Sequence, residues 1–215
     1  MCGGVMNERG LTKGFVAAVA VAAALWFWMF SPWTAGLTPF WLTMAFAAVV
    51  LTGAAMCCGF SWRSLMPINL STLLCSAAIA AVLWGMFWVG DKVSSWLFGF
   101  ARPQVDSIYN MKDGFPSWVI ALLLLVVIGP AEELFWRGFV QQRLSQIWGG
   151  TKGFIVATLV YALIHLWSFN FMLIMAALVA GFVWGLLYRI KPSLLPALVI
   201  SHALWDACVF VVFPI

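Results

Sequence analysis

Six ionisable side chains lie inside long apolar stretches of this chain of 215 residues. They include both of its histidines, and the six are Glu132, Glu133, Arg137, His165, His202 and Asp206. A charge at the middle of a bilayer costs about 2.5–3.5 kcal/mol on an insertion scale, whereas a large apolar residue returns about 0.3–0.6 kcal/mol. Ionisable residues retained at such a cost mark a candidate functional site.

Two kinds of hydrolytic chemistry are open to a carboxylate with two histidines. Glu132 can act as general base on a water that His165 helps to orient, while His202 and Asp206 support the oxyanion. Alternatively, Glu132, His165 and His202 can bind Zn²⁺ or another divalent metal, with an open position for water. The sequence has no GxSxG nucleophile motif, which argues against a covalent route. The residues leave open whether a metal takes part.

Helical spacing limits which of these groups can meet locally. Glu133 and Arg137 are four residues apart and can pair on one helix face. Glu132 is rotated about 100° from Glu133 and is free to point elsewhere. His202 and Asp206 are also four apart, so the stretch HALWD presents two polar groups to one point. Glu132 is therefore the carboxylate expected to face the histidines of other helices.

Each group also has a structural interpretation. The three charges of EELFWR could mark only the exit of a helix into the cytosol, and a lone His165 on an apolar helix is more often a packing residue. The HALWD pair could be a helix–helix hydrogen bond. Pro130 removes a backbone hydrogen bond, which predicts a kink and a cavity beside Glu132.

The composition predicts the scaffold that must position these groups. The chain is 65% hydrophobic and 8% charged, with a mean hydropathy of +1.04. Soluble domains have about 25% charged residues, so a water-soluble globule is excluded. Long apolar runs without alternation favour helices over a β-barrel. We therefore predict an all-α integral membrane protein.

Seven membrane-spanning helices are expected, at 14–30, 40–60, 70–90, 117–144, 153–167, 171–188 and 194–213. Residues 1–215 are predicted to form one transmembrane domain, divided into 1–115, with three spans and an outer connection, and 116–215, with the polar motifs. The bundle is expected to enclose a buried polar cavity that opens to the cytosolic side. The connection 91–115 is either an interfacial segment or a solvated loop.

Basic residues predict the orientation of the bundle. With the N-terminus in the cytosol, the inside segments hold Arg9, Lys13, Arg63, Arg143, Lys152, Arg189 and Lys191, and the outside segments hold Lys92, Arg102 and Lys112. This is a positive-inside bias. The net charge of +4 therefore reports topology, and nothing in it suggests nucleic-acid binding.

Three short motifs resemble those of one family. EELFWR (132–137) matches EExxxR, YALIH (161–165) is similar to FxxxH, and HALWD (202–206) is similar to HxxxN/D. They occur in the same order as in the CAAX protease and bacteriocin-processing family, which includes the type II CAAX prenyl endopeptidases. The resemblance covers about residues 129–206, and the first three spans are compatible with it.

The resemblance implies an intramembrane endopeptidase whose active site faces the cytosol. It implies that Glu132 and His165 activate water and that His202 and Asp206 stabilise the oxyanion. Glu133 and Arg137 would be structural or would orient the substrate. The family is often called a metalloprotease, and the role of a metal in it is disputed.

Two residues depart from the family pattern. Tyr161 stands where Phe is usual, which adds a hydroxyl that can bond to Glu132 or His165. Asp206 stands where the eukaryotic enzymes have Asn, and an aspartate is a poorer oxyanion donor. The second departure weakens the expectation that the substrate is a prenylated CAAX protein.

Two other functions fit the same residues. One is a non-catalytic family member that acts in bacteriocin immunity or as a membrane interaction protein. The other is a small ion or proton-coupled transporter, which would need a polar path to both faces. For the leading interpretation, we expect the chain in a prokaryotic cell (inner) membrane, with lipid as its surroundings and a peptide or membrane protein, lipidated or not, as substrate.

Overall fold

The computed structural model describes residues 8–60 and 68–215 and is helical throughout its membrane-crossing part. In these two ranges, seven helices are long and apolar enough to cross a membrane. This confirms the predicted class, an all-α polytopic membrane protein. Arg63 of the predicted inside segment lies outside the described residues.

The first three spans are single helices. They are α1 (Glu8–Phe30), α2 (Phe40–Cys57) and α3 (Leu70–Leu97). A turn of 3-10 helix at Ala35–Leu37 joins α1 to α2. Asn69 begins α3 as its N-cap, because its side chain accepts a hydrogen bond from the amide of Thr72 at 2.9 Å. The helix α3 runs seven residues beyond the predicted end at 90, since residues 91–97 remain helical.

The fourth span, Ser117–Trp148, changes its helical geometry along its length. The α-helical parts α5 (Ser117–Leu123), α6 (Gly129–Glu133) and α7 (Gln142–Trp148) alternate with wider π-helical turns at Leu124–Ile128 and Leu134–Gln141. Such turns are often found at functional sites. The π-helical turns thus lie on both sides of α6, which contains Pro130 and both glutamates of EELFWR, and the kink expected at Pro130 stays a prediction.

The last three spans each end in tighter or wider turns. The helix α8 (Gly150–Leu163) continues as 3-10 helix through Ile164–Ser168, and α9 covers Phe171–Ile190. After a 3-10 turn at Pro192–Leu194, α10 (Leu195–Ala207) continues as π-helix through Cys208–Val212. His165 therefore lies on a 3-10 turn, and HALWD lies within α10.

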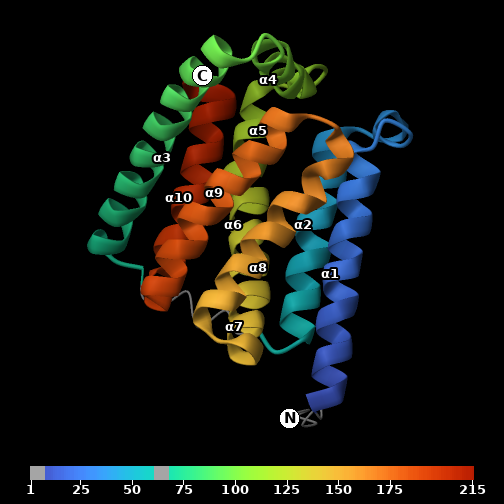
Figure 1. Cartoon of the computed structure of the whole chain (residues 1–215), viewed down its shortest axis with the longest axis vertical. Coiled ribbons are helices and arrows are strands. Elements are labelled where there is room, and N and C mark those ends of the chain that lie inside the picture. Colours follow the sequence, from blue (N-terminus) through green and yellow to red (C-terminus); the bar gives the residue numbers. More distant parts are fainter. Residues whose placement is uncertain (1–7, 61–67) are drawn as a thin grey trace.

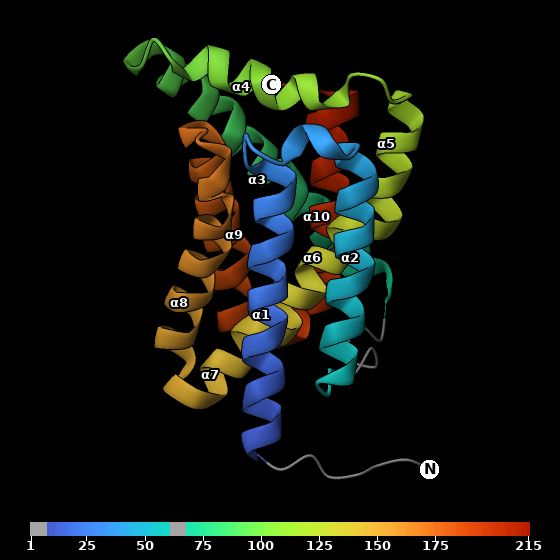
Figure 2. The same cartoon turned by 90° about the vertical axis from the view of Figure 1, so that its right-hand side faces the viewer.

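The helix α10 lies at the centre of the bundle, between α3 on one side and α6 on the other (Figure 1). The helices α1 and α2 lie side by side and cover the opposite face of the fourth span (Figure 2). The short helix α4 (Ala101–Tyr109) runs across the end of the bundle that is far from the N-terminus (Figure 2). Each of the first three spans thus contacts a motif-bearing span: α3 contacts α10, α2 contacts the fourth span, and α1 contacts the 3-10 turn that carries His165.

The connection 91–115 is held by hydrogen bonds to the ends of two spans. After α4 it forms a 3-10 turn at Asn110–Lys112. The hydroxyl of Tyr109 donates to the Val209 carbonyl at 3.1 Å, and Lys112 Nζ donates to the Phe210 carbonyl at 3.1 Å. The indole of Trp41 donates to the Met111 carbonyl at 2.8 Å. The alternative of a plain solvated loop is therefore wrong, because local helix formation and these bonds fix the segment across the bundle.

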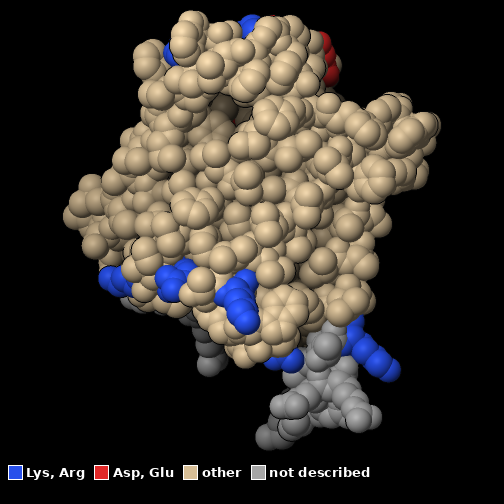
Figure 3. All heavy atoms as spheres, in the orientation of Figure 1, with Lys and Arg blue, Asp and Glu red and all other residues tan. Residues whose placement is uncertain are grey.

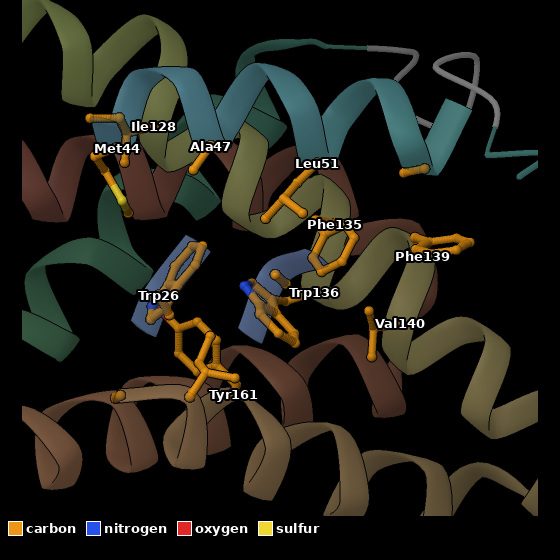
Figure 4. Packing of buried hydrophobic residues seen from close by; sticks show 14 of the residues in the cluster. Trp26, Met44, Ala47, Leu51, Ile128, Phe135, Trp136, Phe139, Val140 and Tyr161 are labelled. Atoms are coloured by element: carbon orange, nitrogen blue, oxygen red, sulfur yellow. The ribbon is translucent and has the colours of Figure 1, made fainter. Parts of the chain in front are cut away.

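A cluster of large aromatic residues packs where the fourth span meets α1, α2 and α8. Trp26, Phe135 and Trp136 are almost fully buried. Trp26 and Trp136 meet edge to face with ring centroids 6.3 Å apart, and Trp136 meets Tyr161 at 5.3 Å. Figure 4 shows these rings between the helices, with Trp26 beside Tyr161. This packing joins the N-terminal spans to the helices that carry the motifs.

Lysine and arginine gather at the end of the molecule near the N-terminus (Figure 3). The structure places Lys13, Arg143, Lys152 and Arg189 at this basic end, because they lie at the ends of α1, α7, α8 and α9 that point the same way. Asp91, Arg102 and Asp106 lie at the other end, near α4. The described residues therefore have the charge asymmetry expected from the sequence, while the orientation in a membrane remains a prediction.

Candidate functional site

Glu132 lies on α6 and faces a cavity. Only 7% of its surface is exposed, and it lines the cavity together with Tyr161, His165, His202 and Asp206. The hydroxyl of Tyr161 donates to Glu132 Oε2 at 2.8 Å. No described residue donates a hydrogen bond to the other oxygen, Oε1. Glu132 is thus a carboxylate with one oxygen fixed and one oxygen available to a ligand in the cavity.

Glu133 joins the guanidinium of Arg137 and the imidazole of His202. Its Oε1 accepts from Arg137 Nη1 at 2.6 Å and from His202 Nδ1 at 2.8 Å. The Glu133 side chain is fully buried, and Arg137 and His202 are nearly so. The predicted i,i+4 pair is present, but the histidine of HALWD contacts the second glutamate of EELFWR rather than the first.

The backbone of α9 receives the polar side chains of the fourth span. Arg137 Nη2 donates to the Gly181 carbonyl at 3.3 Å, and Gln141 Nε2 donates to the Gly185 carbonyl at 2.8 Å. A Cβ at Gly181 would lie 2.8 Å from Tyr161 Cδ1, so the absence of a side chain there allows the approach. Small residues such as these let neighbouring helices approach closely. The Gly181 carbonyl also orients Arg137, and the Gly185 carbonyl orients Gln141.

His202 is held from three directions. Its Nδ1 donates to Glu133, and its Nε2 lies 3.4 Å from Asp206 Oδ2. The indole of Trp184 stacks on the imidazole with ring centroids 4.0 Å apart and an interplanar angle of 16°. Trp184 is fixed in turn because its Nε1 donates to Ser201 Oγ at 3.0 Å. Sequence reasoning missed Trp184, since nothing in its local pattern distinguishes it from other tryptophans of the chain.

Both ring nitrogens of His165 are occupied. His165 Nδ1 lies 2.8 Å from the Tyr161 carbonyl oxygen, which can only accept, so Nδ1 carries the proton. The indole nitrogen of Trp26, which can only donate, lies 3.1 Å from His165 Nε2. His165 is therefore a neutral imidazole with its lone pair directed at Trp26. No direct hydrogen bond joins His165 to Glu132 among the described residues.

The cavity has a volume of about 580 Å³ and is lined mainly by apolar side chains from α2, α3, α4, α9 and α10. Its wall includes Phe40, Phe87, Tyr109, Met172 and Ile215, which lie at the α4 end of the bundle. A hollow is visible near this end in the space-filling view (Figure 3). Glu132 and the two histidines lie at the other, inner part of the cavity.

The predicted opening of the cavity to the cytosolic side stays a prediction. The predicted topology places the N-terminal, basic end in the cytosol, whereas many of the lining residues lie at the α4 end. The polar groups are buried as expected, and the lining is mainly apolar. Hydropathy and charge locate the ends of spans, whereas a void depends on how side chains of different helices fill space.

The predicted metal ligands do not form a metal site. In the described ranges, no three side chains among His, Cys, Asp and Glu come together as a ligand group. Both nitrogens of His165 are engaged, and His202 Nδ1 is committed to Glu133. The arrangement of Glu132, His165 and His202 as metal ligands, which the sequence left open, is therefore not supported, and neither is the description of the protein as a metalloprotease. The spacing in the sequence could not reveal these competing bonds.

A comparison with protein families gives a match in the part of the chain that carries the three motifs. Residues 114–208, a little under half of the chain, match the family model Rce1-like, described as "Type II CAAX prenyl endopeptidase Rce1-like". This segment is similar to the Rce1-like family. The resemblance based on the three motifs is thereby confirmed, and all three motifs fall within the Rce1-like segment. No match to a curated protein or to a solved structure was found.

The structure brings the predicted site residues of the Rce1-like segment into one region. Glu132, Tyr161, His165, His202 and Asp206 all line the cavity. Glu133 and Arg137 lie behind them in a buried ion pair. The residue outside the segment that contacts the site most directly is Trp26, for which the sequence carries no local signal, because it lies 139 residues from its partner.

Proposed function

We propose that the protein is an intramembrane endopeptidase in which Glu132 is the general base. The observation that carries this proposal is the Glu132 carboxylate, which faces an apolar cavity with Oε2 held by Tyr161 and with Oε1 available. A carboxylate fixed in this way can take a proton from a water bound beside it. The family match supports the same class of activity.

The reaction begins with a water between Glu132 Oε1 and the scissile carbonyl. Glu132 takes a proton from this water as its oxygen attacks the carbonyl carbon, which becomes a tetrahedral oxyanion. The proton then passes from Glu132 to the leaving amide nitrogen, and the C–N bond breaks. The products are a carboxylic acid and an amine, the acid passes its proton to the amine to give a carboxylate and an ammonium group, and Glu132 returns to its ionised form.

His202 is the group best placed to stabilise the oxyanion. Because Nδ1 already donates to Glu133, a donor toward the cavity requires a second proton on Nε2. The negative charge of Glu133 and the stacked face of Trp184 both favour such an imidazolium. Asp206, whose Oδ2 lies 3.4 Å from Nε2, orients this nitrogen. When substrate is bound, the Nε2 proton would be donated to the oxyanion in place of Asp206. No step in this scheme passes through a metal.

The apolar wall of the cavity supports a substrate with a long apolar portion. Aromatic and methionine side chains, among them Phe40, Phe87 and Met172, line the path from the α4 end to Glu132. A hydrophobic peptide segment or a lipid-modified peptide can occupy this path, while the scissile amide meets the polar groups at its inner end. The same apolar lining offers little support for a transporter, which needs a polar path.

A cleavage assay with the full chain in lipid vesicles tests the proposal. The substrates are hydrophobic peptides with and without a prenyl group, and mass spectrometry identifies the products. We expect Glu132→Gln, which keeps the size of the side chain, to reduce the rate by about 10²–10⁴, the usual contribution of a general base. Asp106→Asn is the matched control, because it makes the same chemical change at an exposed carboxylate on α4.

The outcomes separate the enzymatic function from the alternatives. Cleavage by the wild type that persists in Glu132→Gln would contradict the mechanism. Absence of cleavage in every protein, together with bacteriocin immunity that persists in Glu132→Gln, would indicate a non-catalytic member of the family. Loss of cleavage in Asp106→Asn as severe as in Glu132→Gln would show that the assay reports folding rather than chemistry.

A further inference from the structure

The first span supplies a side chain that meets His165 at the atom needed for chemistry. Trp26 lies on α1, outside the segment 114–208 that matches the family. Its indole N–H donates to His165 Nε2 at 3.1 Å. Since Nδ1 carries the only proton of the neutral ring, Nε2 holds the only lone pair with which His165 could orient a water. That lone pair is occupied in the structure.

The contact is part of a rigid aromatic arrangement. Trp26 is 1% exposed, and its ring meets His165 edge to face with centroids 6.0 Å apart. Phe30, one turn further along α1, lies against the same imidazole at 5.5 Å. On its other side, Trp26 packs against Trp136 of the fourth span. Figure 4 shows Trp26 beside Trp136 and Tyr161 in the buried cluster.

The geometry has a direct chemical consequence. A second proton on Nε2 and the indole N–H would be two donors facing each other at 3.1 Å, so the indole is compatible only with the neutral tautomer. A water in the cavity and the indole also compete for one lone pair. His165 lines the cavity, so a ligand can reach it once the indole moves aside.

We propose that Trp26 caps His165: its indole N–H holds the imidazole in the Nδ1–H tautomer with Nε2 covered, and this bond opens when water or substrate engages His165. Trp26 is therefore a positioning residue that acts through His165. The catalytic meaning of the cap rests on the proposed function, whereas the contact itself does not. Glu132, whose Oε1 receives no hydrogen bond from a described residue, stays available throughout.

Nitrogen NMR tests the cap without any turnover. The chain has two histidines, so ¹⁵N-histidine labelling of the full protein in detergent micelles gives two imidazole rings, and His165→Gln assigns them by loss of one. We expect the wild-type His165 to be protonated on Nδ1 and to accept a hydrogen bond on Nε2. In Trp26→Phe, the Nε2 resonance should move downfield toward that of a free lone pair, while Nδ1 keeps its proton.

Chemical modification gives a second measurement. Diethyl pyrocarbonate acylates a neutral imidazole at a free nitrogen, and peptide mass spectrometry reports His165 separately from His202. We expect Trp26→Phe to accelerate acylation of His165 by about two- to tenfold, the range of a single ordinary hydrogen bond. Trp136→Phe is the matched control. This variant removes a neighbouring buried indole whose N–H has no acceptor among the described residues. His165 of the variant should therefore be acylated at the wild-type rate.

Three results would overturn the cap. One is a wild-type spectrum with the proton of His165 on Nε2, which needs no variant and so cannot be confused with misfolding. The others are equal acylation of His165 in Trp26→Phe and the wild type, and equal acceleration by Trp26→Phe and Trp136→Phe.

The proposed function can fail separately. Cleavage that persists in both Glu132→Gln and His165→Gln would remove the enzymatic mechanism and leave the cap intact. The converse result is also possible. If His165 is essential for cleavage but is acylated equally in Trp26→Phe and the wild type, the proposed cap is contradicted and the mechanism is not.

Discussion

His202 Nδ1 lies 2.8 Å from Glu133 Oε1. The histidine of the last span is therefore bonded to the second glutamate of EELFWR, behind the cavity, while the first glutamate faces the cavity. Arg137 donates to the same oxygen at 2.6 Å. Two adjacent carboxylates thus have separate environments, one within a buried ion network and one beside a void.

Glu133→Gln should destabilise the fold. Removal of one partner from a buried ion pair costs about 3–5 kcal/mol, because the remaining charge loses its compensation. Here Arg137 and His202 would both lose the carboxylate. The free energy of unfolding in mixed detergent micelles measures the effect. Asp106→Asn breaks an exposed pair with Arg102 and should cost no more than about 1 kcal/mol. Similar costs for the two variants would contradict the buried network.

Tyr161→Phe should retain activity within about tenfold of the wild type, since it removes one hydrogen bond to Glu132 and conserves the aromatic ring. Phenylalanine is also the usual residue at this position in the family that the motifs resemble. The cleavage rate of the variant, measured beside that of Glu132→Gln, tests this expectation. A loss as deep as that of Glu132→Gln would make the Tyr161 hydroxyl part of the chemistry.

Gly129→Ala should be destabilising by about 1–3 kcal/mol, the range of overpacked cores. A Cβ at Gly129 would lie 2.7 Å from Cα of Ala203, and neither backbone can move without shifting α6 against α10. Gly85→Ala is the matched control, because a Cβ there meets no described atom within 4 Å. It should be neutral or stabilising by up to about 1 kcal/mol. Equal stability of the two variants would argue against the close contact of α6 with α10.

Chelation should leave cleavage unchanged. The nitrogens of His165 and Nδ1 of His202 are bonded to protein groups, and no ligand group forms among the described side chains. The measurement is the cleavage rate after dialysis against EDTA, followed by addition of Zn²⁺. A rate that falls on dialysis and returns with Zn²⁺ would show that these bonds rearrange around a metal.

Sequence reasoning located the spans and the pair of Glu133 with Arg137 because both depend on local features. Apolar runs predicted seven helices, and the spacing of Glu133 and Arg137 predicted their ion pair. The ends of helices were less well placed: α3 continues to Leu97, beyond the polar Asp91 that suggested its end, because Asp91 is compensated by Lys92 and Arg102. Local pattern cannot show such compensation when the partner lies in another helix.

Contacts between distant segments were predicted only in part. The Tyr161 hydroxyl was expected to bond to Glu132 or His165 and bonds to Glu132, whereas His202, expected beside Glu132, is bonded to Glu133. The contact of Trp26 with His165 spans 139 residues and joins a span without motifs to one with a motif. These pairings follow from helix rotation and packing in three dimensions, which periodicity alone does not determine.

The cavity lies toward one end of the molecule. The void that reaches Glu132 lies toward α4, and the basic residues gather at the other end. In the proposed function, a peptide would meet the Glu132 carboxylate from the side of α4. Insertion of the same helices in the opposite direction would then move the proposed activity to the other compartment, although every contact within the protein stayed the same.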